Sequence, residues 1–551
     1  MKTELQPVEK ETIEDPSQAK LTPSYCILTL PLAVRPFQAH AIDKRLETAR
    51  QLYNSLLSTE MSKYRRITHT PEYLVISKGI YALLDEYYVD PPLTEEDIKA
   101  GKKRKIDPQY KTDVRYKDLL KQRNQYYRDN GFHGSYSFQP DLAPLKNYYE
   151  TIFKDGKIKK NPQIGAQVCN ELAIRLWQSF EKFLYKGSAV RYIRKGELNT
   201  LESSNKQTPM VVKDGVFYWH GLACPLKMSA GNMYEAEMLT KEICYYRLVR
   251  KFVRGENKYY VQIILKGTPV AKRNKETGSF MHQTSLERVG LDIGLQVLAA
   301  VSKDQVRLIE LADRCGSLDT KLEAKMQFID RSRRATSPWR FNPDGTIRRQ
   351  RSGTKENWRW FLSHAYFDTK GDIKEIHRFS ADVRKMQHNV LANEVLEIGS
   401  DIIIENINFS GLSKRAQETV TREDGSIESK KRGGKSISTK APAMFVSILE
   451  NKCKAATGHA LNKVDTKTIK ASDYDHTTGK YQKRESLSRW VYLANGDKVH
   501  RNLYCAFLLF CVADGCIDQK QCDIMYPSFK HMHDQELVRL KGKNDSLFFE
   551  P

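Results

Sequence analysis

The stretch VGLDIGL places one carboxylate, Asp292, in the middle of what reads as a buried strand. Leu, Val and Ile surround it, and two further strand-like runs, VLAAVSK and VRLIELA, follow directly. An ionised Asp in such surroundings costs several kcal/mol unless something pairs with it. The chain must therefore fold so that this carboxylate meets a partner, either hydrogen-bond donors that serve the structure or a cation that serves chemistry.

The segments that follow favour the cation. A basic helix, DTKLEAKMQFIDRSRRA, and a second long helix over 373–399 lead to the strand-like run DIIIENINFSGL, in which Glu405 ends the strand. A three-stranded antiparallel meander with Asp on its first strand, then a helix and a strand ending in Glu, is an RNase-H-like order. In that fold the strand positions of Asp292 and Glu405 are neighbours, so both carboxylates could share a metal ion. Phosphodiester hydrolysis uses two Mg²⁺ ions held by such carboxylates about 3.5–4 Å apart.

Length and charge indicate a large protein with a polyanionic partner. With 551 residues and about 150 residues per domain, three or four units are expected. Lys and Arg number 90 against 67 Asp and Glu, which gives a net charge of +23. Such an excess favours nucleic acid over the alternative of a merely soluble basic protein.

Cysteine usage and hydropathy exclude several classes of protein. Ten Cys are scattered without any CxxC pair, which argues against a zinc ribbon and against a disulfide scaffold. The N-terminus has no apolar signal segment, and no apolar run of about 18 residues could span a membrane. We expect an intracellular protein without zinc and without a membrane partner.

The first half of the chain reads as a β unit interrupted by helices. A strand is expected over 24–34, a helix over 38–66, and a mostly helical stretch over 70–207 with its best amphipathic helix at 164–185. Residues 208–285 alternate β-branched and aromatic residues with Gly or Asn turns, which predicts a small antiparallel β unit. The strand at 24–34 is expected to join the same barrel, with the helical block inserted.

Several segments together resemble one family. ERVGLDIGLQVLAAVS, FIDRSRRATSPWRFNPDGTI, IIIENINFSGL, KASDYDHTTGKYQKRESLSRWVY and KVHRNLYCAFLL look like TnpB, the transposon-encoded relative of type V CRISPR effectors. The likeness is to a longer Firmicutes-type branch without the four-Cys zinc ribbon. It is strong over about 286–512 and weaker over 24–285.

The resemblance implies a fold and partners. The fold class is α+β multidomain, with a small β-barrel wedge domain, a helical recognition insertion and an RNase-H-like (RuvC) α/β nuclease domain. A guide RNA would pair with target double-stranded DNA beside a short motif read by the protein. A RuvC-type nuclease with Mg²⁺ or Mn²⁺ would then cut. The location would be the bacterial cytoplasm, with the nucleoid; monomer and dimer both remain open.

The expected domains follow from the same resemblance. They are a disordered lead at 1–20, a wedge β-barrel at 21–70 and 208–285, a helical recognition domain at 71–207, a RuvC-like nuclease domain at 286–467 and 496–530, an insert at 468–495 in place of the zinc ribbon, and a C-terminal tail at 531–551. Within the nuclease domain, residues 413–440 are rich in Lys, Arg, Ser and Gly and are expected to form a mobile loop.

The third catalytic position departs from the family pattern. TnpB relatives carry a third carboxylate in a pattern such as RDLYSAFL, and this chain reads RNLYCAFL, with Asn502 at that position. Asn is neutral, so a site built for two dications loses one negative charge and should lose turnover. Three interpretations stay open: an engineered substitution, a natural loss that leaves an RNA-guided binder, or rescue by Asp497 or Asp514.

Basic residues outside this triad are candidates for nucleic-acid contact. They are Arg331, Arg333 and Arg334 after the basic helix, and Lys470, Arg484 and Arg489 in and around the ribbon's replacement. The alternatives are a solvated basic face for the first three and a structural salt bridge for Arg489. His476 lacks companion Cys or His residues at ligand spacing and is read as a loop hydrogen-bonder. The function expected is RNA-guided DNA cleavage that Asn502 impairs; a guide-dependent transcriptional repressor and a guide-independent RuvC-like nuclease are the alternatives.

Overall fold

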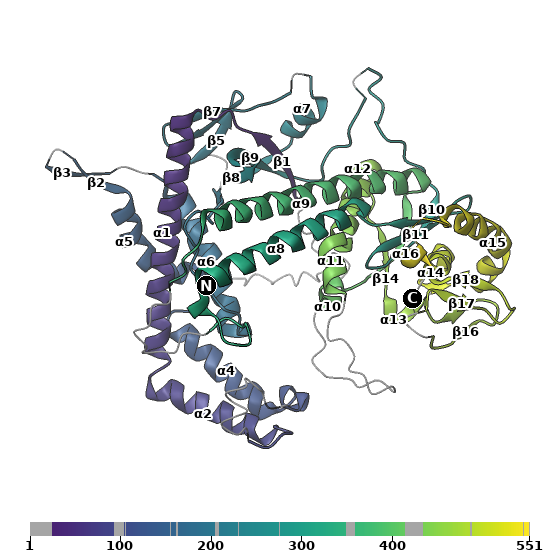
Figure 1. Ribbon diagram of the computed structural model, residues 1–551, viewed down its shortest axis with the longest axis horizontal. Coiled ribbons are helices and arrows are strands. Elements are labelled where there is room, and N and C mark those ends of the chain that lie inside the picture. The colour runs from purple at the N-terminus through teal and green to yellow at the C-terminus, as the bar shows by residue number, and fades with distance from the viewer. Residues whose placement is uncertain are drawn as a thin grey trace, which may run out of the picture.

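The protein is a mixed α+β, multidomain chain, seen here in a computed structural model. The structure describes residues 25–92, 104, 106–154, 156–160, 163–203, 209–229, 231–274, 276–348, 359–413, 433–484, 488–543 and 545–549. Two long helices, α8 (Gly316–Thr336) and α9 (His364–Ile398), run between the N-terminal half and the central sheet of the C-terminal half (Figure 1). The expected disordered lead lies outside the described residues.

Helices dominate the N-terminal half. They are α1 (Pro36–Ile67), α2 (Pro71–Glu86), α4 (Val114–Asp129), α5 (Gln139–Tyr149), α6 (Ala166–Lys186) and α7 (Met233–Leu239), with the short 3-10 helices η1 (Pro108–Lys111) and η2 (Ser135–Phe138). The helices predicted over 38–66 and 164–185 are present as α1 and α6. Their apolar residues recur at helical spacing, so each helix presents one stripe that can be buried.

Strands from distant parts of this half form two sheets. The strands β1 (Tyr25–Pro31), β4 (Thr200–Glu202), β8 (Ile243–Val253) and β9 (Glu256–Lys266) pair in the order β1-β9-β8-β4, and β5 (Met210–Lys213), β6 (Val216–Trp219) and β7 (Leu222–Pro225) pair in sequence. β1 pairs with β9 along its whole length, so the strand predicted over 24–34 does join the β unit. An isolated bridge between Leu32 and Leu226 links the two sheets.

Two features correct the predicted division of this half. β4 precedes the expected boundary at residue 207, yet it pairs with β8 and belongs to the sheet. The stretch expected to be mostly helical also contains a hairpin, formed by β2 (Thr151–Lys154) and β3 (Lys157–Lys160). β4 and the strands of the β2–β3 hairpin are too short to be recognised in a sequence whose pattern is otherwise helical.

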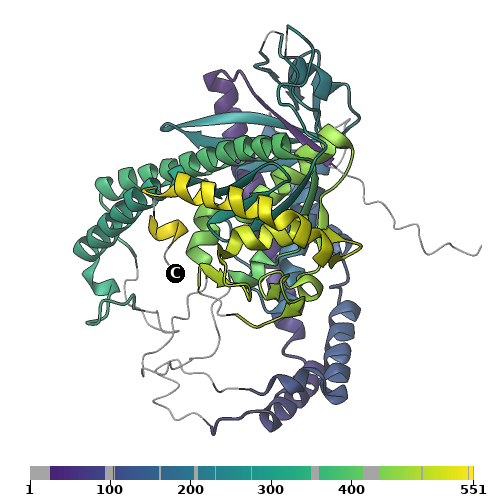
Figure 2. The same cartoon turned by 90° about the vertical axis from the view of Figure 1, so that its right-hand side faces the viewer.

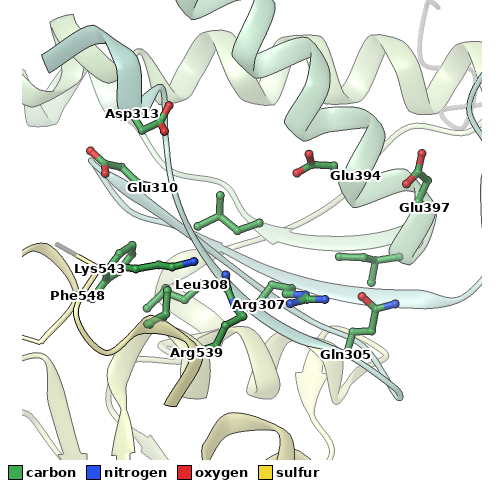
Figure 3. Close-up of a pocket in the computed structure, with 13 residues that line it drawn as sticks. Gln305, Arg307, Leu308, Glu310, Asp313, Glu394, Glu397, Arg539, Lys543 and Phe548 are labelled. Carbon is green, nitrogen blue, oxygen red and sulfur yellow. The ribbon is translucent and has the colours of Figure 1, made fainter. Parts of the chain in front are cut away.

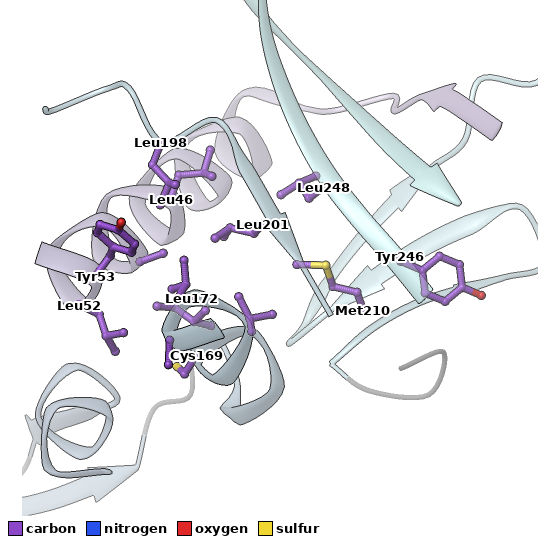
Figure 4. Packing of buried hydrophobic residues seen from close by; sticks show 14 of the residues in the cluster. Leu46, Leu52, Tyr53, Cys169, Leu172, Leu198, Leu201, Met210, Tyr246 and Leu248 are labelled. Carbon is purple, nitrogen blue, oxygen red and sulfur yellow. The ribbon is translucent and has the colours of Figure 1, made fainter. Parts of the chain in front are cut away.

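The helices and sheets of this half share one core. Leu46 and Tyr53 of α1 meet Leu172 of α6, Leu201 of β4 and Leu248 of β8 (Figure 4). All five side chains are buried. Since the residues come from segments far apart in sequence, burial of this cluster holds the inserted helices against the sheet.

The C-terminal half is built on a five-stranded sheet. The strands β10 (Arg288–Ile293), β11 (Val297–Val301), β12 (Val306–Glu310), β13 (Asp401–Glu405) and β14 (Asn462–Val464) lie in the order β12-β11-β10-β13-β14. The first three form the antiparallel meander that the sequence predicts. β13 runs parallel to β10, and β14 runs parallel to β13. The long connection through α8 and α9 permits this parallel pairing, which a tight turn cannot make.

Helices cover both faces of this sheet. Val289 and Leu291 of β10 pack with α9 and with α12 (Pro442–Thr457) on one face. The other face carries α14 (Arg501–Phe510), with α15 (Gln519–Leu540) beside it. The backbone of α14 lies so close to β10 that a Cβ added at Gly290 would be 2.1 Å from the carbonyl oxygen of Ala506. Figure 2 views the molecule from the side of these C-terminal helices.

Smaller elements complete this half. They are η3 (Asp313–Cys315), η4 (Pro338–Arg340), α10 (Phe409–Leu412), α11 (Gly434–Lys440), α13 (Thr466–Ile469), β15 (Tyr474–Asp475), β16 (Lys480–Tyr481), β17 (Trp490–Tyr492), β18 (Lys498–His500), β19 (Val512–Ala513), β20 (Cys516–Ile517) and α16 (Asp545–Phe548). No helix in the described part of the chain combines the length and the apolar character needed to cross a membrane.

Two expectations for this half are corrected. The expected tail at 531–551 is not a tail, because α15 continues to Leu540 and the side chains of His533 and Glu536 are buried. A carboxylate oxygen of Glu536 accepts the backbone N–H of Leu308 on β12 at 2.8 Å, so this segment completes the edge of the sheet. The loop expected at 413–440 ends in α11, and its residues 414–432 lie outside the described part.

Candidate active site

The sheet places Asp292 and Glu405 side by side. β10 and β13 pair in parallel with Leu291 opposite Ile404, so the next residue of each strand is Asp292 and Glu405. Side chains alternate between the faces of a strand, and Leu291 points to the α9 side. Both carboxylates therefore lie on the face that α14 covers.

Burial and mutual repulsion perturb both carboxyl groups. The pKa of Asp292 is raised to about 7, first by burial and then by the charge of Glu405, against the lowering effect of the Arg501 guanidinium. Burial also raises the pKa of Glu405, and a hydrogen bond from the backbone N–H of Ala471 opposes that rise. Two like charges that are poorly solvated favour either a proton or a cation between them.

Asn502 stands at the same end of the sheet. It is the second residue of α14, and its side-chain nitrogen lies 3.5 Å from the position that a Cβ on Gly294 would occupy. Gly294 comes two residues after Asp292. The three positions that the sequence singled out thus come from β10, β13 and the start of α14, and the fold brings them together.

The sequence interpretation missed two residues at this place. Cys505 is buried one helical turn after Asn502, and its pKa is raised well above its usual range by burial and then by Asp292 and Glu405. Arg501 precedes Asn502 and acts on the pKa of Asp292, as described above. The i, i+3 spacing of Cys505 from Asn502 was a usable signal, because such residues share one face of a helix.

The donor set fits one hard divalent cation better than two. Two carboxylates and an amide oxygen are the oxygen ligands that Mg²⁺ and Mn²⁺ prefer. A protonated, buried thiol at Cys505 adds no such ligand. Within the described ranges no three His, Cys, Asp or Glu side chains are close enough together to hold a metal ion. Asn502, the third residue at this place, carries no charge.

Of the basic candidates, Arg484 and Arg489 lie near this site. Arg484 sits over the ring of Tyr504 at 5.8 Å, and its charge acts on the pKa of Cys505. Burial and the charge of Arg501 lower the pKa of Arg489, whose carbonyl accepts the backbone N–H of Arg501 at 2.8 Å. Arg484 is also paired with Asp475 at 3.8 Å and donates to the carbonyl of Ser472 at 3.4 Å.

Lys470 directly precedes Ala471, whose backbone contacts Glu405. Lys470 is exposed and adopts a left-handed backbone conformation, with φ 43°, after α13. The next residue, Ala471, donates its backbone N–H to Glu405. The turn at Lys470 therefore helps to orient Glu405.

The other three Arg candidates belong to the long helix α8, which extends away from the sheet (Figure 1). Arg331 is exposed. Arg333 is paired with Asp330 and lies 5.7 Å from the ring of Trp360, and Arg334 lies 4.9 Å from the ring of Phe341. The fold does not bring this group to the carboxylates.

The two rescue candidates, Asp497 and Asp514, both lie in hairpin turns. Asp497 accepts a hydrogen bond from the hydroxyl of Tyr526 at 2.8 Å, in the turn between β17 and β18. Asp514 lies in the turn between β19 and β20, beyond the far end of α14 from Asn502. His476 is buried and bonded to the hydroxyl of Tyr504 at 2.8 Å, which agrees with its reading as a loop hydrogen-bonder.

A pocket of about 640 Å³ lies elsewhere, along the edge strand β12 (Figure 3). Its acidic side chains include Glu394 and Glu397 of α9, and its basic ones include Arg307 of β12 and Arg539 of α15. β12 is separated from β10 by β11, so this pocket is distinct from the carboxylate site. Its mixed charges give it no clear preference for an anion or a cation.

Comparison with known proteins gives neighbours among solved structures alone. No protein-family model matches the chain, and no curated protein matches it. A Cas12f1–sgRNA–target DNA complex aligns with 88% of this chain and 98% of its own at 10% identity, with a TM-score of 0.36. A CRISPR-Cas12f ternary complex aligns over the same shares at 11% identity, with a TM-score of 0.23. The mini-RNA-guided endonuclease CRISPR-Cas phi3 aligns with 61% of this chain and 60% of its own at 9% identity, with a TM-score of 0.27. These similarities are low, and the functional proposal rests on the chain's own residues.

Proposed function

We propose that this chain is an RNA-guided DNA-binding protein of the TnpB and type V effector class, with a RuvC-like nuclease site that Asn502 impairs. The observation that carries the proposal is the convergence of Asp292, Glu405 and Asn502 at one end of a sheet with RNase-H-like strand order. The net charge of +23 supports a nucleic-acid partner. The resemblance of residues 286–512 to TnpB supports a guide RNA as one of the nucleic-acid partners.

Each residue has a role in the proposed reaction. Asp292 and Glu405 would hold one Mg²⁺ or Mn²⁺ ion, which would activate water and stabilise the leaving oxygen of a phosphodiester. Arg489 and Arg501 would attract the phosphate through their charges. Asn502 offers a neutral oxygen, so the charge that would hold a second ion is reduced and turnover falls. Asp292 must be deprotonated to bind the cation, and its raised pKa means that binding releases a proton and weakens as the pH falls.

A guide-dependent repressor without catalysis is the second candidate, and Asn502 is the observation that favours it. A protein that binds guided DNA and cannot cut would block transcription by occupying the site. A guide-independent RuvC-like nuclease is the third. It predicts that no discrete RNA accompanies the purified protein.

The decisive experiment compares the chain with its Asn502→Asp variant. Both are co-expressed with the gene's genomic flank, and each RNA-loaded complex is given matching DNA and Mg²⁺. We expect Asn502→Asp to cleave at least about 100-fold faster, because it restores a charge that acts in the transition state. Asn130→Asp is the matched control, since it adds the same charge at an exposed position after α4.

The other outcomes have distinct meanings. Equal cleavage by both proteins would show that another ligand fills the third position and that Asn502 does not impair the site. Guided binding without cleavage by either protein would favour the repressor. Cleavage without any co-purifying RNA would favour the guide-independent nuclease.

A further inference from the structure

A second well-formed pocket lies between the two halves of the molecule. Its volume is about 590 Å³, and its lining comes from β1, α7, described residues of the connection between β9 and β10, α9 and α12. α9 and α12 cover the face of the central sheet opposite α14. The pocket is therefore separate from the carboxylate site, and its size is that of a small-molecule site.

The pocket is positively charged. Lys272, Lys385 and Lys452 line it, and none of the described lining residues is acidic. Lys452 is half-buried, with its ammonium group donating to the side-chain oxygen of Asn393 at 2.7 Å. Burial lowers the pKa of Lys452, and the charge of Lys272 lowers it further. One lining side chain, His282, is paired with Glu397 at 3.7 Å, whereas neither Lys272 nor Lys452 pairs with a carboxylate among the described residues. Two ammonium groups in one pocket repel each other, and an anion between them would relieve that repulsion.

Aromatic and amide groups stand beside these charges. Tyr25 and Phe280 line the pocket with 59% and 49% of their surfaces exposed, and the ammonium group of Lys272 lies 5.8 Å from the ring of Tyr234. Asn389 and Asn451 also line it. The guanidinium group of Arg273 lies over the Phe280 ring at 4.5 Å, so the Tyr25 ring and the exposed part of the Phe280 ring offer the stacking surface for a planar base. Amides can both donate to and accept from a base edge.

We propose that this pocket binds a nucleoside phosphate, with the base against the aromatic rings and the phosphate between Lys272 and Lys452. Cations, rings and amides in one pocket match the three parts of such a ligand. Two sources supply this chemistry: a free nucleotide, or one nucleotide extruded from a bound RNA. The second source rests on the proposed function, and the first does not.

The test measures binding of radiolabelled AMP to the full-length, RNA-free protein by equilibrium dialysis, with adenosine and inorganic phosphate as partial ligands. AMP should bind more tightly than either part. Lys452→Met and Phe280→Ala should each weaken AMP binding about tenfold. Lys325→Met is the matched control, because Lys325 lies on α8 outside the pocket, with its side chain 45% exposed and paired with Asp372. Phe280 is partly exposed, so its variant should fold even if Lys452→Met does not. Absence of AMP binding, or equal binding by all variants, would overturn the proposal.

The RNA-loaded complex distinguishes the two sources. If it excludes AMP and Phe280→Ala makes one guide nucleotide newly reactive to chemical probing, the ligand is an extruded nucleotide. If the loaded complex still binds AMP, the ligand is a free nucleotide. Failure of AMP binding with guided DNA binding intact would remove this inference alone. AMP binding without any co-purifying RNA would remove the proposed function alone.

Discussion

The carboxyl group of Asp292 titrates far from the usual range of an aspartic acid. Its pKa of about 7 compares with about 3.9 in an unfolded chain. A raised pKa means that the folded protein binds this proton more tightly than the unfolded chain does. The free energy of unfolding that this carboxyl group contributes is fully present below about pH 4 and decreases as the pH rises to about 7. The metal-free protein is therefore least stable when Asp292 is ionised, which is the form that binds a cation.

Asp292→Asn should stabilise the metal-free protein at pH 8, because it removes a buried charge that repels Glu405. The expected gain is about 1–4 kcal/mol, and it should shrink as the pH is lowered towards 5.5. Thermal unfolding midpoints of the EDTA-treated protein at the two pH values measure it. Asp304→Asn, at an exposed position, should change neither midpoint. A destabilised Asp292→Asn protein at pH 8 would show that the carboxylate is paired within the fold.

At the scale of elements, the site depends on how closely α14 approaches β10. Gly290 allows that approach, because a Cβ there would lie 2.1 Å from the carbonyl oxygen of Ala506 and 2.3 Å from the backbone nitrogen of Phe510. Neither backbone atom can move without shifting the helix. The placement of Asn502 relative to Asp292 therefore follows from one residue without a side chain.

Gly290→Ala should destabilise the protein by about 3 kcal/mol or more, because overpacking here acts on backbone atoms. Urea unfolding followed by circular dichroism measures the loss. Gly316→Ala is the control: a Cβ there meets nothing within 4 Å at the start of α8, and Ala favours the helix. Equal stability of the two variants would mean that α14 is free to move away from β10.

At the scale of the whole molecule, the net charge of +23 is spread over both halves of the chain. Exposed guanidinium groups on α8 lie away from the carboxylates, so their role in the proposed function is to bind phosphates. Arg331 is exposed, whereas Arg333 is paired with Asp330. The charge of a paired guanidinium group is partly neutralised, so the group attracts a phosphate less strongly.

Arg331→Ala should reduce the slope of log affinity against log salt for guided DNA binding by about 1, and weaken binding equally for different target sequences. Arg333→Ala should change the slope less, because its charge is already partly neutralised. Filter binding across a salt series measures both slopes. An unchanged slope for Arg331→Ala would show that this residue makes no phosphate contact.

Local patterns in the sequence predicted the long helices, the meander and the strand positions of Asp292 and Glu405, because helical and strand periodicity act over a few neighbouring residues. The position of Asn502 was expected from the resemblance to TnpB. The pairing of β4 with β8 and the burial of Glu536 against β12 were not predicted. Short strands and a single buried acid in a polar helix leave no periodic signal.

The sequence by itself determined which residues could form a metal site and that one of them is neutral. Only the tertiary structure decided that Asp292 and Glu405 repel each other, that Cys505 and Arg501 stand beside them, and that lysines from separate segments meet in one pocket. The physical reason is that burial and charge interaction depend on distance in space. Parallel pairing and helix packing set those distances between residues far apart in the chain.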